Sequence, residues 1–69
     1  MAQTIFKQIE LTGTSTESME DAVQNAVAKA AKTVRQMRWF EVVESRGAIR
    51  DGAVAEWQVK IKIGFALED

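Results

Sequence analysis

The chain has 69 residues, no Cys, no His and a formal net charge of −1 at pH 7. The lack of Cys excludes disulfides and thiolate metal sites, and the lack of His removes the commonest acid–base catalyst and transition-metal ligand. Balanced charge and the absence of an apolar run near the roughly 20 residues of a membrane span argue against nucleic-acid and membrane partners. We therefore expect a cytoplasmic domain over residues 1–69, without catalytic residues or a metal site, whose marginal core is stabilised by self-association.

The first half of the chain predicts one strand and one helix. A strand is expected over residues 4–11, rich in β-branched and aromatic residues, followed by the connection LTGTSTES. Ser18 is the expected N-cap, and Asp21 completes a capping box. The helix is predicted from Met19 to Gln36 or slightly beyond. Its apolar positions recur at helical spacing and form one Ala-rich stripe: Ala22, Val23, Ala26, Val27, Ala30, Val34 and Met37.

The second half predicts a hairpin. Strands over 39–50 and 53–67 flank Asp51-Gly52, a pair typical of a type I′ turn. The order strand, helix, strand, strand indicates an α+β fold, in which a three-stranded antiparallel sheet of order 1-3-2 packs on the helix. The third strand would reach roughly 46 Å and the helix only about 27 Å. Part of the hairpin should therefore overhang the helix and expose apolar side chains unless another subunit covers them.

The two-residue turn also predicts which hairpin side chains share a face. One face is expected to form the helix-covered core: Phe40, Val42, Ala55, Trp57, Val59, Ile61, Ile63 and Phe65. The polar face is expected to carry Trp39, Glu41, Val43, Ser45, Glu56, Gln58, Lys60 and Lys62. Trp39 is then an aromatic that the core does not use. It either packs at a subunit interface or offers a flat stacking platform, with Gln58 as an amide that reads a planar ligand.

Four blocks, taken in order, resemble the dodecins: LTGTSTESMEDAVQNAV, RWFEVVESRG, the Asp-Gly turn and WQVKIKIGFALED. The resemblance runs from about Lys7 to Asp69. Dodecins are small flavin-binding proteins with β-α-β-β subunits assembled as hollow dodecamers. The resemblance implies a single dodecin-like domain and a homododecamer in which Trp39 stacks on the isoalloxazine ring. It also implies that Gln58 bonds the pyrimidine edge of that ring, and that two flavins stack between two symmetry-related tryptophans.

The expected register separates these two residues. Gln58 pairs near Ser45, six residues from Trp39, which is roughly 20 Å along a strand. A flavin ring is shorter than that distance. If both side chains touch one ring they come from different subunits, unless a bulge shortens the gap, and Gly47 is the candidate bulge.

Two positions bear on a phosphorylated ligand. Arg46 precedes Gly47 as in bacterial dodecins, where this pair lies near the ligand, and it is predicted either to hold a phosphate or to pair with Glu44 or Glu56. Ala66 stands where bacterial relatives commonly have a basic residue. This departure argues against strong phosphate recognition, both for flavin mononucleotide (FMN) and for coenzyme A, which some relatives bind.

The leading hypothesis is a non-enzymatic protein that stores or buffers a flavin (riboflavin, FMN or a lumichrome-like ring) and gives photoprotection by Trp quenching. The alternatives are a flavin-dependent oxidoreductase and a structural oligomerisation module without ligand. A basic row on the expected helix is interpreted as a solvated face rather than a nucleic-acid stripe: Lys29, Lys32, Arg35 and Arg38.

Overall fold

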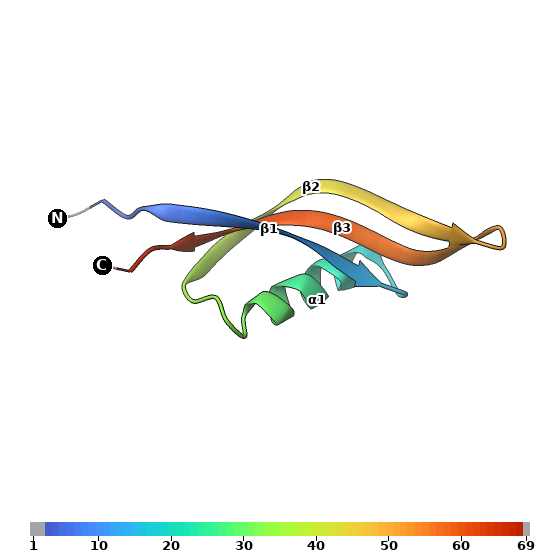
Figure 1. Cartoon of the computed structure of the whole chain (residues 1–69), viewed down its shortest axis with the longest axis horizontal. Helices are drawn as coiled ribbons and strands as arrows, with labels where there is room; N and C mark the ends of the chain where they lie inside the picture. Colours follow the sequence, from blue (N-terminus) through green and yellow to red (C-terminus); the bar gives the residue numbers. More distant parts are fainter. Residues whose placement is uncertain (1–2, 69) are drawn as a thin grey trace.

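The computed structural model describes residues 3–68 as three strands and one helix: β1 (Phe6–Ser15), α1 (Met19–Ala30), β2 (Met37–Arg50) and β3 (Ala53–Ala66). The ends of the expected 1–69 domain, Asp69 among them, lie outside the described residues. β3 pairs antiparallel with both other strands, which gives the sheet order β1-β3-β2 (Figure 1). The α+β fold, the element order and the 1-3-2 sheet predicted from the sequence are therefore confirmed.

β1 extends further than the sequence predicts. The expected strand over 4–11 is wrong at its end, because the supposed connection continues the ladder to Ser15, with Thr14 opposite Gln58. Gly13 lies within this extension. A Cβ atom there would overlap the carbonyl oxygen of Ala22 and lie 2.8 Å from Cβ of Ala26. The glycine that suggests a loop in the sequence instead permits close contact between strand and helix.

The start of α1 follows the prediction only in part. Ser18 is the N-cap, and its Oγ accepts a hydrogen bond from the backbone N–H of Asp21 at 3.0 Å. The reciprocal half of the capping box is wrong. The Asp21 carboxylate accepts a 2.6 Å hydrogen bond from the hydroxyl of Ser15, and that hydroxyl oxygen accepts from the Ser18 N–H at 3.3 Å. Ser15 thus joins the end of β1 to the start of α1.

The helix ends at Ala30, so its predicted extension to Gln36 is wrong. The N–H groups of Lys32 and Thr33 bond carbonyls three residues back, and Gln36 adopts a left-handed φ of 62°. The carbonyl of Gln36 then accepts a hydrogen bond from the N–H of Ala66 at 3.0 Å. Gln36 is therefore already bonded to β3, at the residue where the helix was predicted to end.

Because the helix ends early, several residues that the apolar and basic sequence patterns placed on it lie elsewhere. Val34 and Met37 pack against the core from the loop and from β2. Of the predicted basic row, only Lys29 lies in α1. The interpretation of that row as one helix face is therefore wrong.

The core lies between α1 and the centre of β3. Three small residues of the helix pack on three β-branched residues of the strand: Ala22, Ala26 and Ala30 with Val59, Ile61 and Ile63. The helix lies over β1 and β3 and leaves β2 largely uncovered (Figure 1). Phe40 and Val42 face the helix side as predicted, yet each is 51% exposed. These two residues therefore do not complete a core within one chain.

The hairpin turn confirms the prediction. Asp51 and Gly52 have φ values of 53° and 76°, and Arg50 pairs with Ala53. Twelve helical residues span about 18 Å, against roughly 46 Å for the fourteen residues of β3. The hairpin accordingly projects beyond the helix, and the molecule measures 57 × 20 × 13 Å (Figure 1).

The hairpin register departs from strict pairing at three places. The residues left without a partner are Arg38 and Val43 on β2 and Ala55 on β3. Gly47 pairs with Trp57, so its prediction as a bulge is wrong. The extra residue at Val43 turns the following side chains over, because strand residues alternate between faces. Ser45 therefore lies opposite Val59 on the helix side rather than on the polar face.

Across residues 3–68, no helix is both long enough and apolar enough to span a bilayer.

Candidate functional site

Trp39 lies on the sheet face opposite the helix, with its ring flat on β3. It pairs with Gly64, and a Cβ atom on Gly64 would overlap indole atoms Cε2, Cζ2 and Cη2 at nearly equal distances. Near-equal distances to three consecutive ring atoms mean that the face of the ring, rather than its edge, rests on the glycine. The other indole face points outward, and Trp39 is 39% exposed. The structure thus offers one open aromatic face.

Two residues that sequence reasoning missed hold this ring. Gly64 provides the floor, and Phe6 of β1 meets the indole edge-on, with ring centroids 5.0 Å apart and an interplanar angle of 68°. This T-shaped geometry is favourable for aromatic pairs. A glycine inside a strand is a recognised sign of close approach by another group, and that signal was available in the sequence. Phe6 carried no such signal, because its neighbours are set by the register of β1 on β3, which the sequence left open.

Gln58 is the centre of a polar network on the same face. Its carbonyl oxygen accepts a hydrogen bond from Nε of Arg46 at 2.7 Å, and its amide nitrogen donates to the Glu56 carboxylate at 2.9 Å. Glu44 completes the network, 3.4 Å from Nη1 of Arg46 and 3.6 Å from Nζ of Lys60. A primary amide has two N–H donors and two acceptor lone pairs, so these bonds use one of each. One donor and one acceptor of Gln58 remain for a ligand.

The bulge at Val43 brings this network together. After it, Glu44 lies opposite Lys60 and Arg46 opposite Gln58. The register predicted from the turn, which has no bulge, placed Ser45 rather than Arg46 opposite Gln58. Of the two roles predicted for Arg46, pairing with Glu44 is observed, and the contact with Gln58 was missed.

One chain does not bring Trp39 and Gln58 to a common point. Trp39 rests on Gly64, six residues along β3 from Gln58, which corresponds to about 20 Å. The bulges on β2 leave this separation along β3 unchanged. Any planar ligand that contacts both residues therefore has to take them from different chains.

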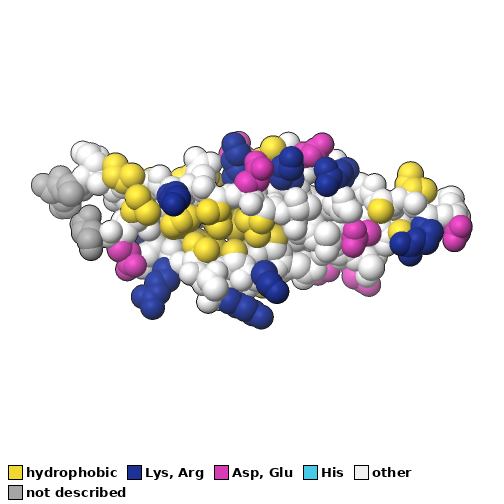
Figure 2. All heavy atoms as spheres, viewed as in Figure 1, with side chains coloured by type: hydrophobic (Ala, Val, Ile, Leu, Met, Phe, Trp, Pro, Cys, Tyr) yellow, Lys and Arg dark blue, Asp and Glu magenta, His cyan; other side chains and the backbone are white. Residues whose placement is uncertain are grey.

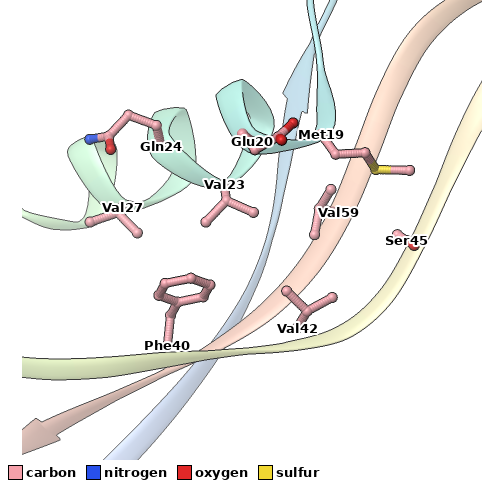
Figure 3. A pocket seen from close by; sticks show the side chains of 9 residues that line it. All are labelled: Met19, Glu20, Val23, Gln24, Val27, Phe40, Val42, Ser45 and Val59. Atoms are coloured by element: carbon pink, nitrogen blue, oxygen red, sulfur yellow. The ribbon is translucent and has the colours of Figure 1, made fainter.

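An open apolar groove lies on the other side of the sheet. It has a volume of about 580 Å³ between α1 and the uncovered half of β2, where Phe40 and Val42 point towards Val23 and Val27 (Figure 3). The full lining is Met19, Glu20, Val23, Gln24, Val27, Phe40, Val42, Ser45 and Val59. This lining offers few polar groups to orient a ligand, and the groove does not contain Trp39 or Gln58.

Apolar side chains are also exposed along the outside of the molecule. Ile49 and Val54 near the hairpin tip are 78% and 52% exposed, and yellow side chains gather there and in a broader patch toward the other end (Figure 2). Such surfaces are typical of subunit contacts. In the part of the chain that the structure describes, no three His, Cys, Asp or Glu side chains group as a potential metal site.

Comparison with known proteins assigns the chain to a family. The dodecin family model matches residues 5–68. The dodecin of Thermus thermophilus is 49% identical over 65 residues, which are 94% of each chain. The solved dodecin of Streptomyces coelicolor has a TM-score of 0.95 and 46% identity, and the match covers 100% of this chain and 99% of that one.

A more distant relative carries a different name. The calcium dodecin of Mycobacterium tuberculosis, solved with a calcium-binding site, is 29% identical with a TM-score of 0.81, over 93% of this chain and 91% of that chain. The fold, the ordered sequence blocks and these matches agree with one another. The chain belongs to the dodecin family.

Proposed function

We propose that this dodecin binds flavin, stores it and quenches its photochemistry, with Trp39 as the stacking residue and Gln58 as the residue that reads the ring edge. Membership in the dodecin family supports a small, non-enzymatic ligand-binding protein. The single observation that carries the finer proposal is the Trp39 indole, which lies flat on Gly64 with one face open.

The geometry of the indole limits how a flavin can stack. Because the sheet covers one face of Trp39, each tryptophan contacts one face of one ring. The second face of that ring needs another planar partner, and a second flavin on a symmetry-related Trp39 supplies it. Both ring faces are then occupied, which leaves no space for a reducible substrate and disfavours an oxidoreductase.

Quenching follows from contact stacking. Tryptophan is a good electron donor to a photoexcited flavin, and van der Waals contact makes this transfer fast. The charge-separated pair then recombines, and the excitation is lost as heat before it reaches oxygen or a substrate. Riboflavin, FMN and lumichrome-like rings share the tricyclic system on which this process depends.

Self-association completes the proposed site. We infer self-association, because the apolar side of β2 and the projecting hairpin are exposed in a single chain and fit burial against other copies. Membership in the dodecin family makes a homododecamer the expected assembly. A second chain is also required if Gln58 is to reach the ring stacked on Trp39, given their separation of about 20 Å. Assembly and ligand binding are therefore expected together.

The test is to examine freshly purified protein for colour, mass and bound ligand. We expect a mass near twelve chains by size exclusion with light scattering, and a released flavin identified by mass spectrometry. Added riboflavin should lose its fluorescence on binding. A colourless assembly that ignores riboflavin, FMN and lumichrome would support the oligomerisation module instead. A monomer or dimer at micromolar concentration would contradict the proposed assembly.

A further inference from the structure

The orientation of the Gln58 amide is held by two charged neighbours of opposite sign. The guanidinium of Arg46 donates to its oxygen at 2.7 Å, and the carboxylate of Glu56 accepts from its nitrogen at 2.9 Å. Turning the amide over would place the carbonyl oxygen against the Glu56 carboxylate. The same turn would place the NH₂ group against the Arg46 guanidinium. Both contacts would become repulsive, so the two neighbours select the same orientation.

This arrangement determines what Gln58 can offer a ligand. A free amide on a strand surface can present either end to a given direction at little cost. Here the oxygen and nitrogen each have one bond made and one capacity left. The remaining N–H and lone pair therefore project with a fixed polarity. A donor next to an acceptor, as in the imide edge of a flavin pyrimidine ring, matches that pattern.

We infer that Glu56 is a positioning residue for flavin recognition, which acts by fixing the amide of Gln58 together with Arg46. This inference rests on the proposed flavin function. Glu56 precedes Gln58 by two residues on β3, so both side chains lie on the same face of the sheet. Its hydrogen bond to Gln58 is partly buried, which protects it from water more than the neighbouring contacts of Arg46.

Two probes distinguish a fixed amide from a free one. Lumiflavin carries the imide N–H, whereas 3-methyllumiflavin has a methyl group in its place, and neither carries a phosphate or ribityl chain. The ratio of their dissociation constants measures how strongly the protein reads the imide edge. We expect wild-type protein to favour lumiflavin by about tenfold, the effect of losing one hydrogen bond and leaving its partner unsatisfied.

The decisive variant is Glu56→Gln, which keeps the shape but lets the side chain donate as well as accept. Gln58 then loses one of the two groups that select its orientation, and we expect the ratio to fall to about threefold or less. Glu10→Gln is the matched control, since Glu10 lies exposed on the same sheet face and carries the same charge. Its ratio should equal that of wild type. Glu56→Thr, which keeps a β-forming residue but has a shorter side chain without the carboxylate, replaces Glu56→Gln if that variant does not assemble.

Three outcomes separate this inference from the proposed function. A reduced ratio in the Glu56 variant, with intact assembly and an unchanged Glu10→Gln control, supports positioning by Glu56. A Glu56 variant with the wild-type ratio overturns the inference and leaves flavin binding standing. Wild-type protein that binds neither probe overturns the proposed function, and the inference with it.

Discussion

Two glycines on neighbouring strands leave space for very different neighbours. Gly13 on β1 makes room for the backbone of α1 at Ala22, and Gly64 on β3 makes room for the indole of Trp39. The first contact is internal and closes the core, with Ala22 fully buried. The second lies on the opposite sheet face and supports a side chain that is still 39% exposed. One glycine therefore serves the core, whereas the other supports a partly exposed indole on the opposite face.

The same contrast extends to the two faces of the sheet. On the helix side of β1 and β3, the contacts made by Val59, Ile61 and Ile63 are completed within one chain. On the opposite face, an open indole and an amide with unused hydrogen-bond capacity lie about 20 Å apart. This is the face that the proposed function assigns to the ligand and to contacts with other subunits. Substitutions on the helix side should consequently change the free energy of unfolding, and substitutions on the opposite face should change flavin affinity.

The largest effect on folding is expected from Gly13→Ala. The added methyl group overlaps the carbonyl of Ala22, so helix and strand have to move apart. Overpacking costs about 1–3 kcal/mol, and contact with backbone places this site near the upper value. Urea denaturation should show a lower midpoint. Thr12→Ala is the control, because its side chain points away from the helix, and its free energy of unfolding should change by less than about 0.5 kcal/mol.

Trp39→Ala should have the largest effect on ligand binding with little effect on folding. Stacking of a base on an aromatic side chain is worth about 1–3 kcal/mol, so flavin affinity should fall by a factor of roughly 5 to 150. The flavin that still binds should regain fluorescence. Trp57→Phe is the matched control, since Trp57 pairs with Gly47 at the other end of the hairpin. Quenching that persists in Trp39→Ala and disappears in Trp57→Phe would assign the electron donor to Trp57.

Gly64→Ala should weaken binding less than loss of the indole does. The methyl group lifts the ring from β3 and disturbs its edge contact with Phe6, without touching the helix side. We expect flavin affinity to fall by about 3- to 30-fold, and the free energy of unfolding to change by less than about 1 kcal/mol. Titration and urea denaturation of the same preparation measure both. An equal loss of stability in Gly64→Ala and Gly13→Ala would contradict the division between the two faces.

The sequence predicts most of this fold because its strongest patterns are local. The first strand, the helix and the Asp51-Gly52 hairpin determine the order of the elements along the chain. Because the first two strands run in the same direction and the third runs against them, an antiparallel sheet requires the third strand in the middle, which gives the order 1-3-2. The predicted helix end is wrong because Val34 and Met37 keep helical spacing by coincidence, whereas α1 ends at Ala30 and the backbone of Gln36 already pairs with Ala66. Whether the helix continues to Gln36 or ends at Ala30 depends on tertiary pairing, which the local sequence pattern does not contain.

The candidate site is less accessible to sequence reasoning than the fold. Trp39 and Gln58 stand out as an aromatic and an amide on one face of the hairpin, and the structure places both on that face. The bulge at Val43 has no marker, since valine is an ordinary strand residue, yet it moves Arg46 beside Gln58. The sequence marks Gly64 as a site of close approach, but Trp39 is identified as its neighbour only when the strand pairing is known. Long-range register therefore limits what a sequence alone can say about the site.

The smallest effect is expected at Ala66, where a charge is added at the margin of the indole surface. Ala66 is 8% exposed and pairs with Phe6, so an arginine there has to extend past the Phe6 ring to reach solvent. In the free protein Arg46 already bonds Gln58 and Glu44, which leaves it less able to hold a phosphate. We therefore expect riboflavin to bind the wild type at least as well as FMN.

Ala66→Arg should shift this preference toward FMN by about 3- to 10-fold, because a charge-assisted contact to the phosphate is gained at a partly screened position. Ala66→Met is the matched control, since it adds comparable length without charge, and it should leave the FMN-to-riboflavin ratio unchanged. Exposed charges are screened by salt, so the shift should be larger at about 0.01 M than at about 0.15 M ionic strength. Fluorescence titration of both flavins at both salt concentrations measures this effect.

A wild-type preference for FMN of tenfold or more would show that another cation holds the phosphate. In that case ligand binding must release Arg46 from Gln58, and the same titration with Arg46→Ala would then abolish the preference.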